Sequence, residues 1–301
     1  MNPALALLLD EQRSATLPTL TQRDVSLPRL PGIATALVGM RRVGKSYLLY
    51  QEMQRLIAAG IPRSSILTLN LEDDRLGPAD LTTLSEALEY LFRTGPRRHE
   101  QPGYIFLDEV QVVPEWEKFV LRVLNTEDVH VFVTGSSAKL LSTEIATGLR
   151  GRSTAVEVLP FSFREFLRHR GTEGLGSSPV SAAARSELER ALDAYLRIGG
   201  FPGVQNLEPV DRRRMLQDYV DLVVFRDVVD RWAVTNLVVL KWLVARLLSS
   251  FSRAFTVNKL HNDLKSQVRR AGCGCGPRCG HRVGGPAHPP GQRNTIHSRH
   301  A

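Results

Sequence analysis

The stretch "IATALVGMRRVGKSYLLYQEMQRLIAAG", residues 33–60, decides the fold of this chain. It begins with an apolar run of strand length at 33–39 and passes through a turn that contains glycine. It then continues into a segment whose apolar residues recur at helical spacing until Gly60. The stretch therefore predicts a buried strand, a tight turn and an amphipathic helix in direct succession.

The same alternation of short apolar runs and amphipathic segments recurs further along the chain. This pattern is what a parallel sheet covered by helices on both faces requires. From about residue 161 only helical patterns follow, with breaks at 171–179 and 198–203. We expect strands at 33–39, 65–71, 104–110, 129–135 and 154–160, and helices at 45–60, 79–93, 115–125 and 138–147.

The turn after the first strand, "GMRRVGKS", fits the pattern G-x-x-x-x-G-K-S with a strand before it and a helix after it. In such a loop the backbone N–H groups wrap a triphosphate, and the helix N-terminus adds a partial positive charge. A glycine-rich turn with an incidental lysine is the alternative. We expect Lys45 to neutralise the β- and γ-phosphates and Ser46 to ligate Mg²⁺. The residues expected to bind the nucleotide are Gly39, Arg42, Val43, Gly44, Lys45, Ser46 and Tyr47.

Two adjacent acids, Asp108 and Glu109, follow the apolar part of the strand "YIFLDEV". An acid at the end of a neighbouring strand can hold the Mg²⁺ shell, and the acid beside it can orient and deprotonate water. A polar strand end that caps the next helix is the other interpretation. Adjacent acids indicate hydrolysis more than simple nucleotide storage, so we assign Asp108 to the metal and Glu109 to catalysis.

Polar residues after two further strands are candidates for the same site. Thr134 and the serines Ser136 and Ser137 end the strand "VFVTGSS", and a hydroxyl there could contact the attacking water or the γ-phosphate. Turn chemistry explains these serines nearly as well. Arg150 and Arg152 precede the fifth strand, where an arginine could reach the γ-phosphate of a neighbouring subunit; a solvated or salt-bridged arginine is the alternative. We prefer Thr134 and Arg152 as the catalytic candidates.

Charge and composition limit the remaining classes of function. The net charge is +8, but residues 268–301 hold six Arg and no acid, so the first 267 residues carry a net charge of +2 and no global basic field for nucleic acid. No apolar run approaches the length that spans a bilayer, and the N-terminal "MNPALALLL" lacks the basic lead of a secretory signal. The first 267 residues contain no cysteine. We expect a cytoplasmic protein with no membrane partner.

Several motifs together resemble a prokaryotic family of AAA-type P-loop ATPases. In order they are "GMRRVGKS", "LNLED", "YIFLDEVQ" with Trp116 downstream, "VTGSS", "LRGR" and "LPFSFREFL". The later "YLRIGGFPGV" and "VFRDVVDRWAVTN" resemble the helical domain that follows the ATPase in that family, and the resemblance covers about residues 20–267. It implies ATP as the nucleotide, a catalytic-glutamate core and an arginine of "LRGR" as a trans-acting finger. It also implies work as a homo-oligomer or as a nucleotide-switched regulator.

The predicted fold class is α/β: a P-loop NTPase parallel sheet with helices on both faces, followed by a smaller all-helical domain and a disordered tail. The helical part ends in "RAFTVNKLHNDLKSQ", which looks like the entry into a winged helix-turn-helix, but the chain then switches to Gly, Pro, Arg, His and Cys. Any DNA-binding role of full-length relatives is therefore not transferred to this chain. The expected parts are an N-terminal segment at 1–30, an AAA-type ATPase domain at 31–172, an incomplete helical domain at 180–267 and the tail at 268–301.

The tail contains Cys273, Cys275, Cys279 and His281, which together suggest a zinc site. The C-x-C spacing is tighter than the usual C-x₂₋₄-C, and little apolar material surrounds it, so we do not expect a metal there. We interpret the tail as disordered and as an out-of-frame or truncated end, to be tested by reading the nucleotide sequence around codon 268 in all three frames.

Two functions follow from these residues. The first is Mg²⁺-dependent ATP hydrolysis with Glu109 as the base. The alternative is a nucleotide-switched regulatory or binding module with little turnover. A weaker third idea makes the basic tail a nucleic-acid arm.

Overall fold

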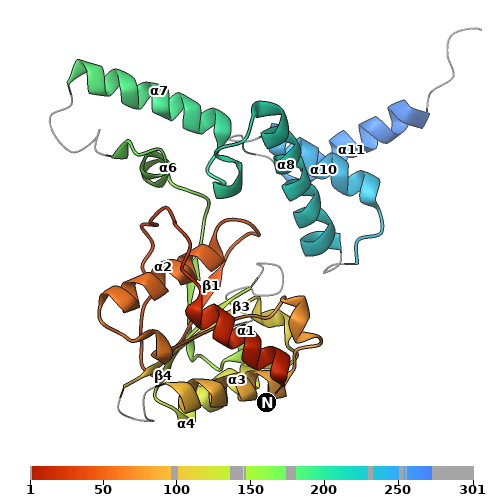
Figure 1. Cartoon of the computed structure of the whole chain (residues 1–301). Coiled ribbons are helices and arrows are strands. Elements are labelled where there is room, and N and C mark those ends of the chain that lie inside the picture. Colours follow the sequence, from red (N-terminus) through yellow and green to blue (C-terminus); the bar gives the residue numbers. More distant parts are fainter. Residues whose placement is uncertain are drawn as a thin grey trace, which may run out of the picture. The chain divides into compact units, whose positions relative to one another are not determined.

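The computed structural model of the chain describes residues 2–95, 101–135, 145, 147–173, 181–229, 233–250, 254 and 256–272. The chain divides into two compact units, Met1–Thr235 and Asn236–Ala301. The first unit contains the sheet and the helices as far as residue 229 (Figure 1). No described helix is both long and apolar enough to cross a membrane.

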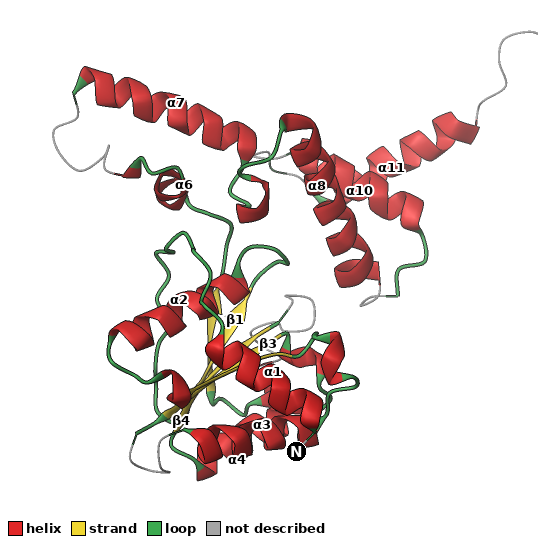
Figure 2. Ribbon diagram, viewed as in Figure 1, coloured by secondary structure: helices red, strands yellow, loops and turns green. Residues whose placement is uncertain are grey.

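A five-stranded parallel sheet forms the centre of the first unit, with the strand order β2-β3-β4-β1-β5 (Figure 2). Because all strands run in the same direction, their carboxyl ends meet at one edge of the sheet. The register places Asn70 opposite Asp108, and Leu37 opposite Thr134. The strands are β1 (Ala34–Val38), β2 (Ile66–Asn70), β3 (Gly103–Asp108), β4 (Val129–Thr134) and β5 (Ser153–Glu157).

Helices cover both faces of this sheet. Because alternate strand residues point to opposite faces, one strand contributes side chains to two apolar cores. Ile105 and Leu107 join one apolar core, whereas Phe106 and Phe132 join the other and stack with their ring centroids 4.7 Å apart. The first core also takes residues of α1 (Pro3–Ser14), α3 (Leu81–Thr94) and α4 (Trp116–Thr126), and the second takes residues of α2 (Lys45–Ala58). The α/β fold class predicted from the sequence is confirmed.

Helix α1 lies within the N-terminal segment 1–30, in which no helix or strand is predicted above. Leu5, Leu8 and Leu9 are buried, and the helix packs against β2 and α3. The Asn2 side chain caps it by accepting from the Ala4 amide at 2.9 Å. The spacing i, i+3, i+4 of these leucines after an N-cap residue was a readable helix signal.

Only helices follow the sheet in the described residues, as the sequence predicts. In the first unit these are α6 (Phe163–His169), α7 (Ala182–Ile198), α8 (Pro209–Leu222), the short η5 (Pro202–Val204) and the π-helix η6 (Val223–Val229). The second unit contains α10 (Leu237–Ser249) and α11 (Val257–Gly272). Short 3₁₀ turns lie at Arg63–Ser65, Asp74–Leu76 and Val110–Val112. Most of the helix expected at 138–147 and all of residues 273–301, with the cysteines, lie outside the described residues.

The boundary between the two compact units falls after Thr235. The segment that follows the expected boundary at 171–179 belongs to the same compact unit as the sheet. The Phe161 amide donates to the Gly200 carbonyl, and the Tyr195 hydroxyl donates to the Phe161 carbonyl, both at 2.7 Å. These bonds tie the segment from α7 to η5 to the chain that leaves β5.

Candidate functional site

The loop between β1 and α2 has a backbone that glycine makes possible. Gly39 has φ +157°, and a Cβ there would lie 2.3 Å from the Val158 carbonyl oxygen. Gly44 has φ +98° and is the N-cap of α2. Arg42 adopts φ 65° without being glycine, which stores backbone strain in the loop. The two glycines of the motif therefore sit where a side chain is either excluded or strained.

Lys45 opens α2 and bends across this loop. Its side chain is buried, and Nζ donates to the carbonyl oxygens of Gly39 and Met40, each at 3.0 Å. The first amides of α2 have no acceptor within the helix, and they carry the positive end of its dipole. Phosphate oxygens could replace the two carbonyls as acceptors for Nζ, so the loop fits a phosphate group.

The two acids lie together at the end of β3, as the sequence predicts. Glu109 follows the strand in a left-handed conformation with φ 53° and ψ 48°. Its amide donates to Thr134 Oγ1 at 3.1 Å, and Thr134 Oγ1 in turn donates to the Asp108 carboxylate. Thr134 is fully buried at the end of β4. One hydroxyl thus joins both acids, and the strain at Glu109 is held by the surrounding structure.

Residues that the sequence analysis did not single out complete this edge. Gln111 Nε2 donates to Glu109 Oε2 at 2.5 Å, so the glutamate side chain is held as well as its backbone. Asn70, at the end of β2, lies opposite Asp108. The position of Asn70 at the end of a predicted strand, in "LNLED", could have identified it as a candidate site residue. The contact of Gln111 carried no such signal, because a side chain three residues after the end of a strand can turn in many directions.

Ser46, Asp108, Asn70 and Tyr50 line a cavity of about 120 Å³ at this edge. Burial raises the pKa of the Tyr50 hydroxyl, and the Asp108 charge raises it further. A hydroxyl and a carboxylate are oxygen ligands of the kind that Mg²⁺ takes when it keeps several waters and binds substrate phosphates. In the described parts of the chain, no group of three or more His, Cys, Asp or Glu could hold a metal. The donor set therefore fits Mg²⁺ bound together with a phosphate ligand.

A second cavity, of about 270 Å³, borders the loop at Gly44. Thr21 of the N-terminal segment, Gly44 and Tyr47, and then Phe161 and His169 contribute to its lining. The Thr21 hydroxyl and His169 Nδ1 form a hydrogen bond of 2.7 Å. Aromatic walls next to a phosphate-binding loop suit a planar heterocycle such as a nucleobase.

The other expected nucleotide-binding residues fall in different places. Val43 is buried in the core beside α2, and Tyr47 is exposed and lines the second cavity. The Arg42 guanidinium lies over the Tyr219 ring of α8, 4.7 Å from its centroid.

Arg152 does not join the site of its own chain. It directly precedes β5, and its carbonyl accepts from the Ala34 amide at the start of β1. Its side chain bonds to Asn125 of α4. Arg152 therefore lies at the amino edge of the sheet, opposite Lys45 and the acids, and Arg150 precedes it there. Ser136 and Ser137 lie outside the described residues.

Comparisons with known proteins agree with this geometry. Residues 32–167 match the family described as an AAA domain. An uncharacterised protein of Methanocaldococcus jannaschii is 32% identical over 86% of this chain and 56% of its own length. An uncharacterised protein of Haemophilus influenzae is 29% identical over 76% of this chain and 54% of its own. This chain thus spans about half the length of these relatives.

Among solved structures, C. elegans PCH-2 is similar over 65% of this chain and 61% of its own, with a TM-score of 0.38 and 13% identity. The AAA domain is a nucleotide-binding domain of ATPase type, and it covers the phosphate loop, both acids and Thr134. Residues 32–167 of this chain therefore match the AAA domain family.

Proposed function

We propose that this protein binds ATP and hydrolyses it to ADP and phosphate with the help of Mg²⁺. The observation that carries the proposal is the pair Asp108 and Glu109, joined by Thr134 at the sheet edge where the phosphate loop ends in Ser46. A site for nucleotide storage alone has no need of a second acid held in a strained backbone.

Each residue has a separate task in this reaction. The loop amides and Lys45 bind the β- and γ-phosphates, and the second cavity takes the base. Ser46 and Asp108 would hold Mg²⁺, which supplies positive charge against the phosphate oxygens. Glu109 accepts a proton from a water molecule whose oxygen attacks the γ-phosphorus. The bond between this phosphorus and the bridging oxygen breaks, and its electron pair leaves with ADP.

The contacts of Glu109 support the role of a base. Gln111 orients the carboxylate through Oε2, and Thr134 fixes the backbone amide. Thr134 thereby acts on the reaction through the two acids, in addition to the sensing of water or γ-phosphate expected from the sequence.

The test compares three variants with the wild type in an ATP-binding titration and a phosphate-release assay. Lys45→Ala should lose at least about 100-fold in ATP affinity, since the buried ammonium has no substitute. Glu109→Gln should keep its affinity and lose about 10²–10⁴-fold in turnover. Lys118→Ala is the matched control, because Lys118 is exposed on α4 and pairs with Glu115. Wild-type turnover in Glu109→Gln would disprove the mechanism.

A second candidate function is a nucleotide-switched module that turns over little ATP. It is favoured by the contact of the phosphate loop with the helices beyond the sheet, where Arg42 stacks on Tyr219 and Gly44 approaches Pro202. Phosphates bound at Gly44 could therefore change the position of α8. Saturable ATP binding without phosphate release would support this candidate over hydrolysis.

Arg152 is proposed to serve the site of a neighbouring copy in a homo-oligomer, because it lies at the edge opposite its own site. Mixing Arg152→Ala with Glu109→Gln tests this. Each variant supplies what the other lacks, so the mixture should regain part of the wild-type turnover although each alone is inactive. Turnover of Arg152→Ala alone at the wild-type rate would rule the role out.

A further inference from the structure

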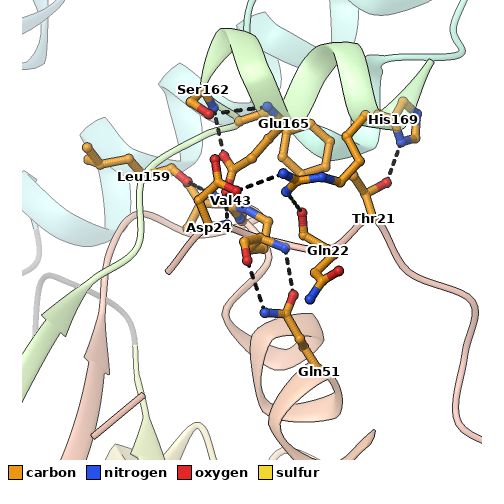
Figure 3. Close-up of polar contacts among 12 residues, drawn as sticks. Thr21, Gln22, Asp24, Val43, Gln51, Leu159, Ser162, Glu165 and His169 are labelled. Carbon is orange, nitrogen blue, oxygen red and sulfur yellow. Dashed lines mark hydrogen bonds and ion pairs between the residues drawn. The ribbon is translucent and has the colours of Figure 1, made fainter. Parts of the chain in front are cut away.

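A buried ion pair links the N-terminal segment to helix α6 (Figure 3). Arg23 Nε donates to Glu165 Oε1 at 2.8 Å, and the two side chains are only 5% and 4% exposed. Glu165 belongs to the "LPFSFREFL" stretch, and the proposed reaction assigns no task to Glu165 itself. Removing two charges from water costs free energy, so a buried ion pair is weak evidence for stability. We therefore ask which groups this pair positions.

Arg23 uses its remaining donors on two carbonyl oxygens. Nη1 donates to Val43 of the phosphate loop at 3.0 Å, and Nη2 donates to Leu159 after β5 at 2.6 Å. The guanidinium also lies over the Phe161 ring, 5.0 Å from its centroid. The planar, multi-donor guanidinium makes such a three-way junction possible, and lysine cannot reproduce it.

Glu165 is held by more than the arginine. Oε1 also accepts from the Asp24 amide at 2.9 Å, and Oε2 accepts from the Ser162 amide at 2.8 Å in the capping box of α6. Burial raises the pKa of Glu165, but the hydrogen bonds from Arg23, Ser162 and Asp24 outweigh burial and leave it below the ordinary value. The carboxylate is therefore charged at neutral pH.

The backbone of Arg23 is fixed from a different side. Gln51 of α2 accepts from the Arg23 amide at 2.6 Å and donates to its carbonyl at 3.1 Å (Figure 3). Arg23 is thus held at both ends: Gln51 of α2 binds its backbone, and Glu165 binds its guanidinium.

This geometry reaches the nucleotide site in two places. A peptide is planar and trans, so holding the Val43 carbonyl on Arg23 also fixes the Gly44 N–H in the opposite direction. Gly44 belongs to the phosphate loop, and a Cβ on it would come within 3.4 Å of Arg23 Nη1. Thr21 and Arg23 also line the second cavity. One guanidinium therefore orients a loop amide and a wall of that cavity.

We propose that Glu165 is a positioning residue for nucleotide binding, which acts through Arg23 to preset the phosphate loop and the second cavity. This inference rests on the proposed function. Removing the charge of Glu165 leaves every group that would touch ATP in place but releases the arginine that orients them. The effect should appear in affinity, while the acids at Asp108 and Glu109 keep their rate of chemistry.

A second ion pair of the same segment provides a matched control. Arg29 Nε bonds to Glu52 Oε1 of α2 at 2.7 Å, and the Glu52 side chain is 2% exposed. This pair lies beside Tyr104 and His130, near the start of β3 and β4, and their pKa values respond to Arg29. It has the same chemistry as the first pair and an equally buried carboxylate, although Arg29 is 39% exposed, and it lies at the other edge of the sheet.

The experiment compares Glu165→Gln with Glu52→Gln in the full chain, using ATP titration, turnover against ATP concentration and thermal unfolding. Glu165→Gln should weaken ATP binding and raise KM on the order of tenfold, the loss expected for a charged hydrogen bond, while kcat changes by less than about threefold. Glu52→Gln should lower the melting temperature comparably and leave the affinity within about twofold.

Equal ATP affinities for the two variants would overturn the proposal. If Glu165→Gln does not fold, Arg23→Lys decides instead: it keeps the charge and loses the three-way junction, so wild-type affinity in that variant also overturns it. Absence of saturable ATP binding by the wild type would instead disprove the proposed function itself.

Discussion

The two edges of the sheet are both polar, but they are built differently. At the amino edge Arg29 pairs with buried Glu52, and the Tyr104 ring stacks on His130 with centroids 5.2 Å apart. At the carboxyl edge the backbone has positive φ at four positions, and a cavity borders Ser46 and Asp108. The positions are Gly39, Arg42, Gly44 and Glu109.

The comparison teaches that charge alone does not locate a site in this fold. Buried charges occur at both edges, and positive φ also occurs at the amino edge, at Gly32 and Arg150. At the carboxyl edge the strained residues Arg42 and Glu109 belong to the phosphate loop and the acids, and a cavity lined by Ser46 and Asp108 lies there. Strain of this kind persists only where the surroundings enforce it, and it is common where a protein prearranges groups for a ligand. Changes at the carboxyl edge should thus harm both binding and folding, and changes at the amino edge other than at Arg152 should harm folding alone.

The largest contrast is expected between the two glycines that flank β1. Gly39→Ala places a Cβ 2.3 Å from the Val158 carbonyl oxygen, so the backbone must move, with a loss of more than about 3 kcal/mol in unfolding free energy and of ATP binding. Gly32→Ala has the positive φ of +69° but open space around it, so it should cost about 1 kcal/mol and leave ATP binding intact. Urea denaturation and ATP titration measure both.

Similar losses of unfolding free energy for Gly39→Ala and Gly32→Ala would contradict the expected difference between the two edges. They would mean that the close approach at Gly39 relaxes without cost, and that the loop is not held by its contact with the chain after β5.

A smaller effect is expected from two buried threonines. Thr134→Val removes the hydroxyl that joins Glu109 and Asp108, and Thr35→Val removes a 2.7 Å bond to the Pro28 carbonyl. Each should cost about 1–3 kcal/mol, because a buried polar partner is left unsatisfied. Only Thr134→Val should also lower phosphate release, by at least tenfold. Equal turnover in the two variants would show that the hydroxyl at 134 is merely structural.

The smallest expected effect concerns the amino edge and pH. Burial lowers the pKa of His130 below its ordinary value of 6.5, with Arg29 adding to the shift and Asp128 opposing it. The folded protein therefore favours neutral His130. This contribution to stability is complete above pH 6.5 and is lost as pH falls from there toward the folded pKa.

His130→Phe keeps an aromatic ring to stack on Tyr104 and removes the imidazole that takes up a proton. The variant should lose less stability than the wild type between pH 7.5 and pH 5, as measured by urea denaturation at both values. Tyr104→Phe is the control, since it retains His130 and should keep the wild-type pH dependence. An unchanged pH dependence in His130→Phe would assign the acid sensitivity to other groups.

Much of the fold followed from local sequence, because strands and helices differ in periodicity over a few residues. The motif "GMRRVGKS" and the acids at 108 and 109 were also local, and the parallel sheet brings them to one edge. Arg152 could have been placed by the same rule, since a residue just before a strand lies at the amino edge. The bond between Arg23 and Glu165 spans 142 positions and could not be predicted, because it depends on which distant segments meet.

The contacts of the Glu165 carboxylate have a practical consequence for the isolation of the AAA domain alone. The matched AAA region begins at residue 32, after Arg23 and after the segment that lines the second cavity. A protein trimmed to that region would retain the phosphate loop and both acids and still leave a buried carboxylate without its cation. A preparation of that kind that failed to bind ATP would say nothing about the whole protein, so a usable fragment has to start upstream of Thr19.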